Sequence, residues 1–580
     1  MADQKIENLL NLALWASPEE RLQSSQLRAG YFPADQTFEV LVRYQGDAAS
    51  LRDAGRDYTG LLGNYAILRL SAEDLEAVSR LPQITFIEKP KQMYFAVSAG
   101  RAASCITPVQ SGSAAGVPLT GAGVLLACID SGADYTHPDF RNPDGSTRIL
   151  RLWDQTVPQG PPPEGYRLGT LYTQEQINRA LDSADPLGLV PSRDTSGHGT
   201  AVLGIAAGNG QASSGVLRGV APEAELLVVK LGTPEPGGFP RTTQLMQALD
   251  YAVRVSLELS LPLAVNISFG NSYGSHSGDS LLETYIDTVS NLGRTAICIG
   301  TGNDGEGKTH RSGQMISGEL LDNEFSVGPY TLSTSLQFWK QYVDEADVFL
   351  VHPGGESFGP IRPVLGPLRL RLRNTEVLAY YGMPSPFSLL QEVYMEFLPA
   401  PGSSYVDSGN WSLRLLPRKI TDGSFHMWLP GSGSDSSAFF YLPSPDTTLT
   451  IPSTARRGIS VGAYHAGLQS YAPFSGRGNA VLQGGSKPDL AAPGVEIQAP
   501  KAGGGYGRFT GTSFAAPFVA GSAALLMEWG IVKGNDPFLY GEKVKAYLRS
   551  GARPLPGITT YPDPRVGYGI LCLRESFPGA

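Results

Sequence analysis

The sequence predicts an α/β fold in which helices flank a parallel β-sheet, with an α+β domain before it and a β-sandwich or jelly roll inserted into it. Residues 124–129 are a continuous apolar run, which is typical of a central strand in a parallel sheet. The segment after Pro517 is apolar on all helical faces, which predicts a buried helix. Residues 312–450 instead hold short alternating segments separated by Gly, Pro, Asn and Asp, which indicates an all-β domain.

Length and composition limit the classes of function. A chain of 580 residues is too long for one simple core, and we expect about two to four domains. The net charge of −9 argues against a nucleic acid partner. No apolar run approaches the length of a membrane span, so we expect none. Residues 6–15 are amphipathic and do not form a secretory signal, which indicates an intracellular protein.

The pattern divides the chain into four segments. Residues 1–98 form an α+β domain with a split βαβ order. Residues 99–311 and 451–580 carry the strands and helices of the parallel sheet, and residues 312–450 are the all-β insertion. The expected strands lie at residues 37–44, 60–64, 65–70, 84–88, 226–231, 264–269, 296–300 and 459–463, and the expected helices at residues 48–54, 71–81, 200–208 and 242–259.

Three polar residues stand at the ends of predicted elements. Asp130 follows the first apolar strand, at the carboxyl edge where open α/β sheets place functional groups. His198 lies between two glycines at the start of a small-residue helix. Ser513 precedes the buried helix, near its unpaired N–H groups and the positive end of its dipole. An Asp, a His and a Ser so placed are the parts of a catalytic triad, although Ser513 taken alone could be a helix cap.

The surrounding motifs resemble those of the subtilisin-like serine proteases. The sequences Ile-Asp-Ser-Gly at 129–132, Gly-His-Gly-Thr at 197–200 and Gly-Thr-Ser-Phe-Ala-Ala-Pro at 511–517 match the three signature motifs, in the family order of Asp, His and Ser. The sequence Ile-Gly-Thr-Gly-Asn-Asp at 299–304 resembles the family's oxyanion-hole motif. The 210 residues between positions 303 and 513 exceed the family spacing, and the all-β insertion accounts for the excess.

The resemblance implies a role for each of these residues. Ser513 would be the nucleophile and His198 the general base, and Asp130 would orient His198 and stabilise its protonated form. The Asn303 side chain would donate a hydrogen bond to the oxyanion, together with the Ser513 N–H.

The resemblance also implies partners and a processing step. The substrate would be a protein or peptide, bound by Ser268, Phe269, Gly270 and Gly302. The first 98 residues look like an inhibitory propeptide, cleaved between residues 94 and 103 and then held non-covalently. No cofactor is required. A structural calcium ion is common in the family, but no loop here matches such a site, so no metal ligand is assigned.

The inserted domain, the long N-terminal segment and residues 6–27 are similar to the clostridial Csp germination proteases. This resemblance implies a spore-associated enzyme that activates a protein substrate by limited proteolysis. One alternative is a binding or signalling module whose cleft stays occupied by its propeptide after a single self-cleavage. An esterase is a weaker alternative, because no Gly-x-Ser-x-Gly elbow surrounds Ser513.

The remaining reactive side chains are expected to be structural. The four cysteines are scattered, and we expect free thiols and no disulfide framework or metal site. His276 lies in a polar Gly/Ser loop and is expected to be a solvated surface residue. The three insertion tryptophans are expected in the core. The cysteines are Cys105, Cys128, Cys298 and Cys572, and the tryptophans are Trp339, Trp411 and Trp428.

Overall fold

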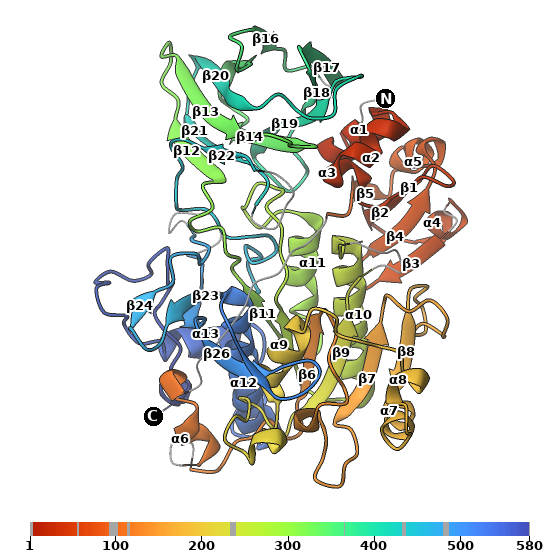
Figure 1. The fold of residues 1–580 in the computed structure, drawn as a ribbon, viewed down its shortest axis with the longest axis vertical. Helices are drawn as coiled ribbons and strands as arrows, with labels where there is room; N and C mark the ends of the chain where they lie inside the picture. Colours follow the sequence, from red (N-terminus) through yellow and green to blue (C-terminus); the bar gives the residue numbers. More distant parts are fainter. Residues whose placement is uncertain are drawn as a thin grey trace.

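The structure, a computed structural model, describes residues 4–54, 57–91, 102–112, 116–232, 239–364, 366–431, 437–478 and 486–578. Figure 1 shows the β-sandwich at the top, the N-terminal domain beside it, and the large sheet with its helices below. Of the segment predicted to be cleaved, residues 94–103, the part from residue 94 to residue 101 is outside the described residues.

A nine-stranded sheet forms the centre of the molecule, in the order β24-β23-β11-β10-β6-β9-β7-β8, with β25 paired to β23. β6 runs parallel to β10 and β9, whereas β8 and β24 run antiparallel to their neighbours. This largely parallel sheet confirms the predicted α/β fold. The strands are β6 Leu125–Asp130, β7 Ile149–Asp154, β8 Thr170–Thr173, β9 Glu225–Lys230, β10 Leu263–Ile267, β11 Thr295–Gly300, β23 Ile459–His465, β24 Ser470–Tyr471 and β25 Leu490–Pro493.

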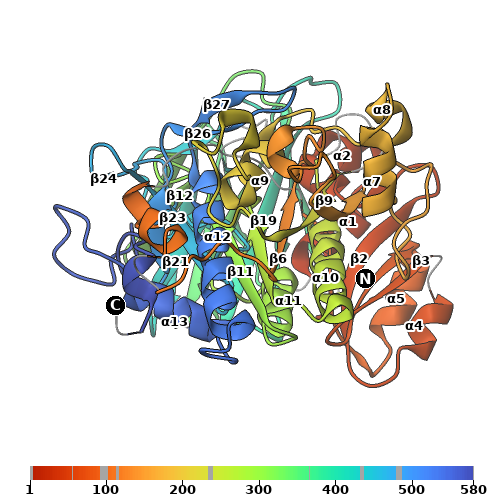
Figure 2. The same ribbon diagram turned by 90° about the horizontal axis from the view of Figure 1, so that it is seen from below.

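Helices cover both faces of this sheet because its strands are apolar on both sides. In β6, Leu126 and Cys128 belong to the core that contains α9 and α12, whereas Leu125 and Ala127 belong to the core that contains α10 and α11. The two helical layers can be followed in Figures 1 and 2. The helices are α6 Thr107–Gln110, α7 Gln174–Leu181, α8 Pro186–Leu189, α9 His198–Ala207, α10 Thr242–Leu259, α11 Leu281–Val289, α12 Ala516–Met527 and α13 Glu542–Ser550.

The helical stretch Thr512–Val532 contains α12 and is long and apolar enough to cross a membrane, with a hydropathy of 1.5. The expectation that no apolar run approaches this length was therefore wrong. In the most apolar window of this stretch, 83% of the residues are buried inside the protein, as in the core helix of a globular domain.

The N-terminal domain is a five-stranded antiparallel sheet covered by short helices. The predicted strand at residues 60–64 lies instead at Asp57–Leu61, directly before a turn into the next strand. Leu61, Tyr65 and Phe86 of this sheet share a core with α10 and α11, so the domain packs on the helical layer of the central sheet. Its elements are α1 Asn8–Trp15, α2 Pro18–Gln23, α3 Ser25–Arg28, β1 Tyr31–Phe32, β2 Thr37–Tyr44, α4 Ala49–Ala54, β3 Asp57–Leu61, β4 Tyr65–Leu70, α5 Ala72–Ser79 and β5 Ile84–Glu88.

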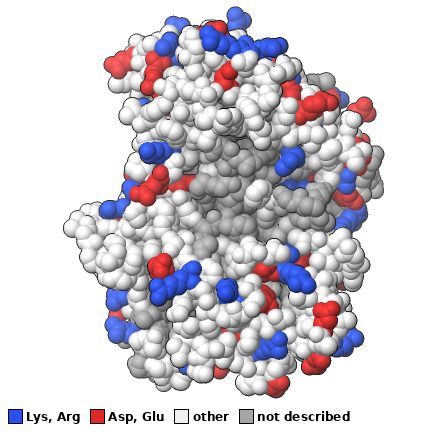
Figure 3. All heavy atoms as spheres, viewed as in Figure 1, with Lys and Arg blue, Asp and Glu red and all other residues white. Residues whose placement is uncertain are grey.

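The insertion forms two antiparallel sheets, ordered β12-β21-β14-β19-β18-β17 and β16-β15-β20-β13-β22, around one shared core. Trp411 lies in that core and Trp428 is buried, but Trp339 is only half-buried, contrary to its expected core position. Figure 3 shows Lys and Arg side chains gathered at the far end of this sandwich. The strands are β12 His310–Gln314, β13 Leu321–Val327, β14 Thr334–Gln341, β15 Glu345–Val351, β16 Ser357–Ile361, β17 Pro367–Leu372, β18 Thr375–Tyr381, β19 Leu390–Pro399, β20 Gly409–Lys419, β21 Ser424–Trp428 and β22 Phe439–Phe440.

The N-terminal domain also packs against the outer face of the sandwich. Val377 and Ala379 of β18 face the sandwich core, whereas Leu378 and Tyr380 share a core with Leu10 of α1 and its neighbours. The domain is therefore held from two sides, by the helices of the central sheet and by the sandwich (Figure 1).

Two of the four cysteines are paired, which corrects the expectation of four free thiols. Cys105 and Cys572 form a disulfide across a sequence separation of 467 residues. Cys128 and Cys298 are free and buried, as expected. The pairing could not be read from the sequence because the two partners meet only when both ends of the chain have folded.

Candidate active site

The structure places Asp130 beside His198. Asp130 is the last residue of β6, and His198 is the first residue of α9. The Nδ1 atom of His198 donates to Oδ1 of Asp130 at 2.6 Å, and both side chains are buried. An ionised carboxylate can only accept a hydrogen bond, so Nδ1 of His198 must carry the proton. Nε2 is then the nitrogen that can act as a base.

Ser513 lies in a short turn, Thr512–Phe514, that leads into α12. Its hydroxyl donates to the backbone oxygen of Ser268 at 3.1 Å, and its own backbone oxygen accepts from the Ser268 hydroxyl at 2.8 Å. The Phe514 and His198 rings pack in a T-shaped arrangement, with the centroids 4.9 Å apart. Ser513 is thus anchored close to His198, with its hydroxyl turned toward Ser268.

Asn303 faces the same turn from the loop after β11. Its Oδ1 atom accepts from the backbone N–H of Thr512 at 3.1 Å and from the Thr512 hydroxyl at 3.2 Å. Because a backbone N–H can only donate, the amide oxygen must face Thr512, and the NH₂ group points the other way. The arrangement therefore presents Nδ2 as a donor, as an oxyanion hole requires.

Asp194 is a positioning residue that the sequence analysis did not single out. Its carboxylate accepts from the hydroxyls of Ser131, Ser196 and Thr200, at 2.8, 3.1 and 2.7 Å. It also accepts from the backbone N–H groups of Gly197 and Thr200, at 2.9 and 2.8 Å, and so holds the start of α9. The available signal was an Asp shortly before a predicted helix, which is typical of a cap.

Ser131 links this cap to the pair of Asp130 and His198. Its hydroxyl accepts from the Gly199 N–H at 2.9 Å, and its own N–H donates to Oδ1 of Asp130 at 2.7 Å. A side chain at position 199 would place Cβ 2.1 Å from the Gly132 oxygen, so only glycine permits this close approach. The strand end and the helix start are thereby locked together.

Three of the four expected substrate-binding residues contact the candidate site: Ser268 bonds to Ser513, the Phe269 ring lies 6.3 Å from the His198 ring, and the Gly302 N–H donates to the Thr512 hydroxyl. The binding role of all four, Gly270 included, stays a prediction. Ser268 and Phe269 are buried, and Ser268 holds the Ser513 backbone as described above. A Cβ atom at Gly270 or Gly302 would meet the Thr450 side chain 2.4 Å away. The chain around Thr450 therefore packs directly against Gly270 and Gly302.

His276 is buried and not solvated, which corrects the expectation. Its ring stacks on Trp428 with the centroids 4.3 Å apart, and Nδ1 lies 2.6 Å from the Leu449 oxygen. Burial lowers the pKa of His276 to about 4, so the ring is neutral at pH 7. The polar loop around it gave no sign of burial, because the sandwich that covers it is distant in sequence.

The Cys128 thiol lies near the site but carries no assigned chemistry. Burial and the adjacent Asp130 raise the pKa of the Cys128 thiol well above its usual value, so this thiol is unreactive. Among the described residues, no three His, Cys, Asp or Glu side chains gather in a way that could hold a metal ion.

Comparison with known proteins agrees with this geometry. Residues 121–392 and 421–569 match the sequence profile of the subtilase family, and residues 4–91 match that of the Csp protease B prodomain. The solved structure of the Clostridium perfringens CspB protease has 36% sequence identity and a TM-score of 0.75, covering 82% of this chain and 96% of that one.

Curated relatives are more distant or match over shorter stretches. The minor extracellular protease Vpr of Bacillus subtilis (strain 168) is 25% identical over 457 residues, which are 75% of this chain and 48% of that protein. Subtilisin of Bacillus pumilus is 42% identical over 81 residues, which are 14% of this chain and 26% of that protein. This chain thus spans about half the length, or less, of these relatives. Because the subtilase profile covers more than half of the chain, the protein belongs to the subtilase family.

Proposed function

We propose that the protein is a serine endopeptidase that hydrolyses peptide bonds through an acyl-enzyme. The observation that carries this proposal is the 2.6 Å hydrogen bond between His198 and Asp130, next to Ser513 at the start of a buried helix. His198 takes the proton of the Ser513 hydroxyl as the oxygen attacks the peptide carbonyl. Asp130 holds the required tautomer and stabilises the imidazolium.

The oxyanion of the tetrahedral intermediate is stabilised by the N–H of Ser513 and the Nδ2 group of Asn303. His198 then donates its proton to the leaving amine, and water hydrolyses the acyl-enzyme with His198 again as the base. In the structure the Ser513 hydroxyl points at the Ser268 oxygen. The O–H bond of Ser513 must therefore turn from the Ser268 oxygen toward His198 before attack.

The same site is proposed to cleave the chain once, between residues 94 and 103, and to keep the freed propeptide bound. Residue 91 ends the described part of the N-terminal domain, and its backbone oxygen accepts from the Thr242 N–H at the start of α10. A linker attached so close to the catalytic domain is effectively concentrated at the cleft, which makes intramolecular attack fast. The freed domain would then stay bound through its two packed faces.

Gel electrophoresis tests this step. Wild-type protein should give fragments of about 10 and 50 kDa on a denaturing gel, and these should co-elute under native conditions. The Ser513→Ala variant should run as one band. An uncut wild-type band, or a cut that persists in Ser513→Ala, would overturn autoprocessing.

The alternative is a binding module that uses proteolysis only on itself. The N-terminal domain packs on its neighbours through two faces, which favours a long stay of its C-terminal end in the cleft after cleavage. This observation supports the alternative. Titration of active sites with a serine-reactive probe, alongside turnover of a peptide library, separates the two. Labelling and turnover in the wild type but not in Ser513→Ala support the peptidase.

We also propose a spore-associated role in which the enzyme activates a protein substrate by limited proteolysis. The Csp protease B prodomain match and the resemblance to the Csp germination proteases support this role. The test is digestion of extracted spore proteins followed by sequencing of new N-termini. One or a few defined cleavages support limited proteolysis, whereas broad degradation contradicts it.

A further inference from the structure

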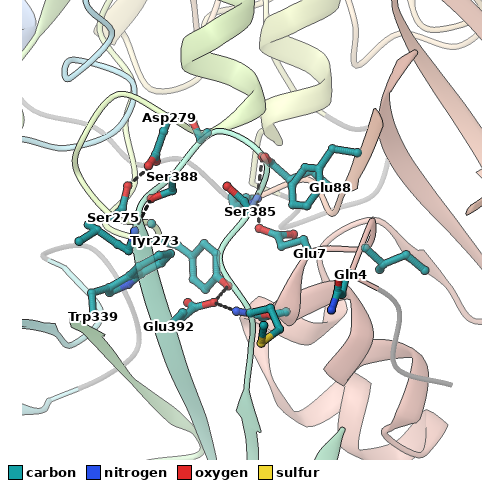
Figure 4. Close-up of a pocket in the computed structure, with 18 residues that line it drawn as sticks. Gln4, Glu7, Glu88, Tyr273, Ser275, Asp279, Trp339, Ser385, Ser388 and Glu392 are labelled. Carbon is teal, nitrogen blue, oxygen red and sulfur yellow. Dashed lines mark hydrogen bonds and ion pairs between the residues drawn. The ribbon is translucent and has the colours of Figure 1, made fainter. Parts of the chain in front are cut away.

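A pocket lies where the N-terminal domain, the loop around Tyr273 and the inserted sandwich meet. It encloses about 70 Å³. One buried water needs roughly 10–15 Å³ on the same measure, so the pocket has room for a ligand of a few heavy atoms. Figure 4 shows Trp339, Tyr273 and Glu392 lying together, with Glu7 and Glu88 on the other side.

The side chains that line the pocket include more acidic groups than basic ones. It is lined by four carboxyl groups, Glu7, Glu88, Asp279 and Glu392, and by the single ammonium of Lys91. That ammonium is already paired with Glu7 at 2.5 Å and with Glu88 at 2.7 Å. The Lys91 charge is thus taken up by two of the carboxylates, and Glu392 forms no ion pair with any residue that the structure describes.

Two buried polar atoms of the lining make no hydrogen bond to any described residue. Glu392 is 3% exposed, and its Oε2 accepts from Asn8 at 2.7 Å and from the Tyr273 hydroxyl at 3.3 Å, but Oε1 has no partner. The indole Nε1 of Trp339 is likewise without one. Trp339 and Glu392 are cross-strand neighbours on β14 and β19, so this unpaired donor and unpaired acceptor sit side by side.

Leaving such atoms unpaired in a buried site is unfavourable, because each has given up its hydrogen bonds to water without a replacement. A ligand that offers both a donor and an acceptor removes both penalties at once. A cationic donor gains further from the carboxylate and from the aromatic rings of Trp339 and Tyr273.

We propose that this pocket binds a small primary amine that carries a hydrogen-bond acceptor next to its ammonium group. The ammonium donates to Oε1 of Glu392, and the acceptor receives the N–H of Trp339. The walls of the pocket come from three parts of the chain that meet only in the assembled protein. By mass action, the bound amine stabilises that assembly.

The Glu392 carboxyl must be ionised to receive the ammonium in this way. Burial raises its pKa to about 7, with Asn8 and Tyr273 donating to it and with Glu7 and Lys91 as its charged neighbours. Below that pH the ligand must displace a proton. We therefore expect affinity to fall as the pH is lowered from 8 to 6.

The test uses the full-length Ser513→Ala chain, in which the proposed self-cleavage is not expected, with titration calorimetry and thermal melting. The probes are ethanolamine, ethylamine and ethylene glycol, which separate the ammonium from the acceptor. Ethanolamine should bind saturably and raise Tm, ethylamine should bind more weakly, and ethylene glycol should have no effect. Glu392→Gln should weaken ethanolamine binding by at least about tenfold.

Two variants keep the result interpretable. Trp339→Phe should remove the advantage of ethanolamine over ethylamine, because Phe keeps an aromatic ring beside the ammonium but has no N–H for the acceptor. Glu396→Gln is the matched control, because both oxygens of that buried carboxyl on the same strand already have partners, Ser24 and Tyr394. It should bind ethanolamine as the parent does.

Several outcomes would overturn the proposal. One is the absence of saturable binding by any amine. Another is equal binding by the parent and by both pocket variants. A third is equal competition by sodium or potassium chloride, which would show an adventitious ion site.

Discussion

At the scale of single residues, the orientation of the Asn303 amide carries the clearest prediction. Its oxygen is tied to Thr512, so only its NH₂ group can serve the oxyanion. We expect Asn303→Ala to lower kcat about 100- to 1,000-fold, with little change in KM, because the donor acts on the transition state. Asn303→Asp keeps the acceptor for Thr512 but loses the donor, and should be impaired at least as much. A loss confined to KM in steady-state kinetics would contradict the assignment.

We expect Asp194 to affect catalysis indirectly, by holding other residues of the site in position. Asp194→Ala leaves five donor contacts without their acceptor. We expect it to lower the free energy of unfolding by about 2–3 kcal/mol and also to lower kcat, because Ser131 and Asp130 lose their support.

The matched control for Asp194→Ala is Asp185→Ala, since Asp185 caps the short helix α8 by accepting from the Gly188 N–H. Chemical denaturation and peptide kinetics measure both variants. A stability loss with unchanged kcat would show that Asp194 is only a helix cap.

The sequence could locate the residues proposed to be catalytic, because short motifs carry them on strand and helix ends, and the structure places Asp130 against His198. The direction of the Ser513 hydroxyl and the burial of His276 could not be predicted from the sequence. Both depend on contacts with residues far along the chain, Ser268 for one and Leu449 with Trp428 for the other. Local sequence contains no information about which distant segment will cover a loop.

At the scale of elements, the Cys105–Cys572 disulfide ties the start of the catalytic part to its end. Cross-links that close long loops typically stabilise by about 2–4 kcal/mol. We expect Cys105→Ser, or added reductant, to lower the unfolding temperature while kcat stays unchanged, since neither cysteine belongs to the site. The Cys105→Ser/Cys572→Ser protein should not respond to reductant. Titration of four free thiols in the unreduced protein would contradict the pairing.

The strands of the insertion show which strands an alternation of apolar and polar residues can predict and which it cannot. Strands with one buried face, such as β13, alternate in sequence and fit the all-β prediction. β18 does not follow this pattern, because residues 377–381 are apolar throughout and do not alternate. Such a run is typical of a strand buried on both faces, and the N-terminal helices cover its second face.

At the scale of the whole molecule, the N-terminal domain fills the space between the sandwich and the helices of the central sheet. Its removal would expose the apolar outer face of β18 and β19, together with the two buried carboxyls Glu392 and Glu396. Exposing apolar surface is unfavourable, but exposing a buried carboxyl becomes favourable once it can ionise in water. The pH should therefore control how firmly the domain is held.

The sign of this control follows from the pKa values. Burial raises the pKa of Glu392 and of Glu396 from 4.5 to about 7 while Asn8 and Ser24 of the N-terminal domain donate to them. A carboxyl whose pKa is higher in the assembled state stabilises that state fully below 4.5, and this contribution is lost as the pH rises through 7. Lys89, whose pKa burial lowers to about 7, is largely protonated in both states below pH 7 and opposes the trend only above it.

We therefore expect the cleaved propeptide to dissociate more readily at pH 7 than at pH 5. The measurement is the urea concentration at which the two fragments separate on size-exclusion chromatography. Each carboxyl alone should weaken retention by more than about tenfold across this window, so the urea midpoint should fall clearly as the pH rises. Glu396→Gln cannot ionise at this position and should flatten the dependence, whereas replacement of the exposed Glu73→Gln should leave it unchanged. A midpoint that stays constant from pH 5 to 7, or that rises, would show that the buried carboxyls do not govern retention.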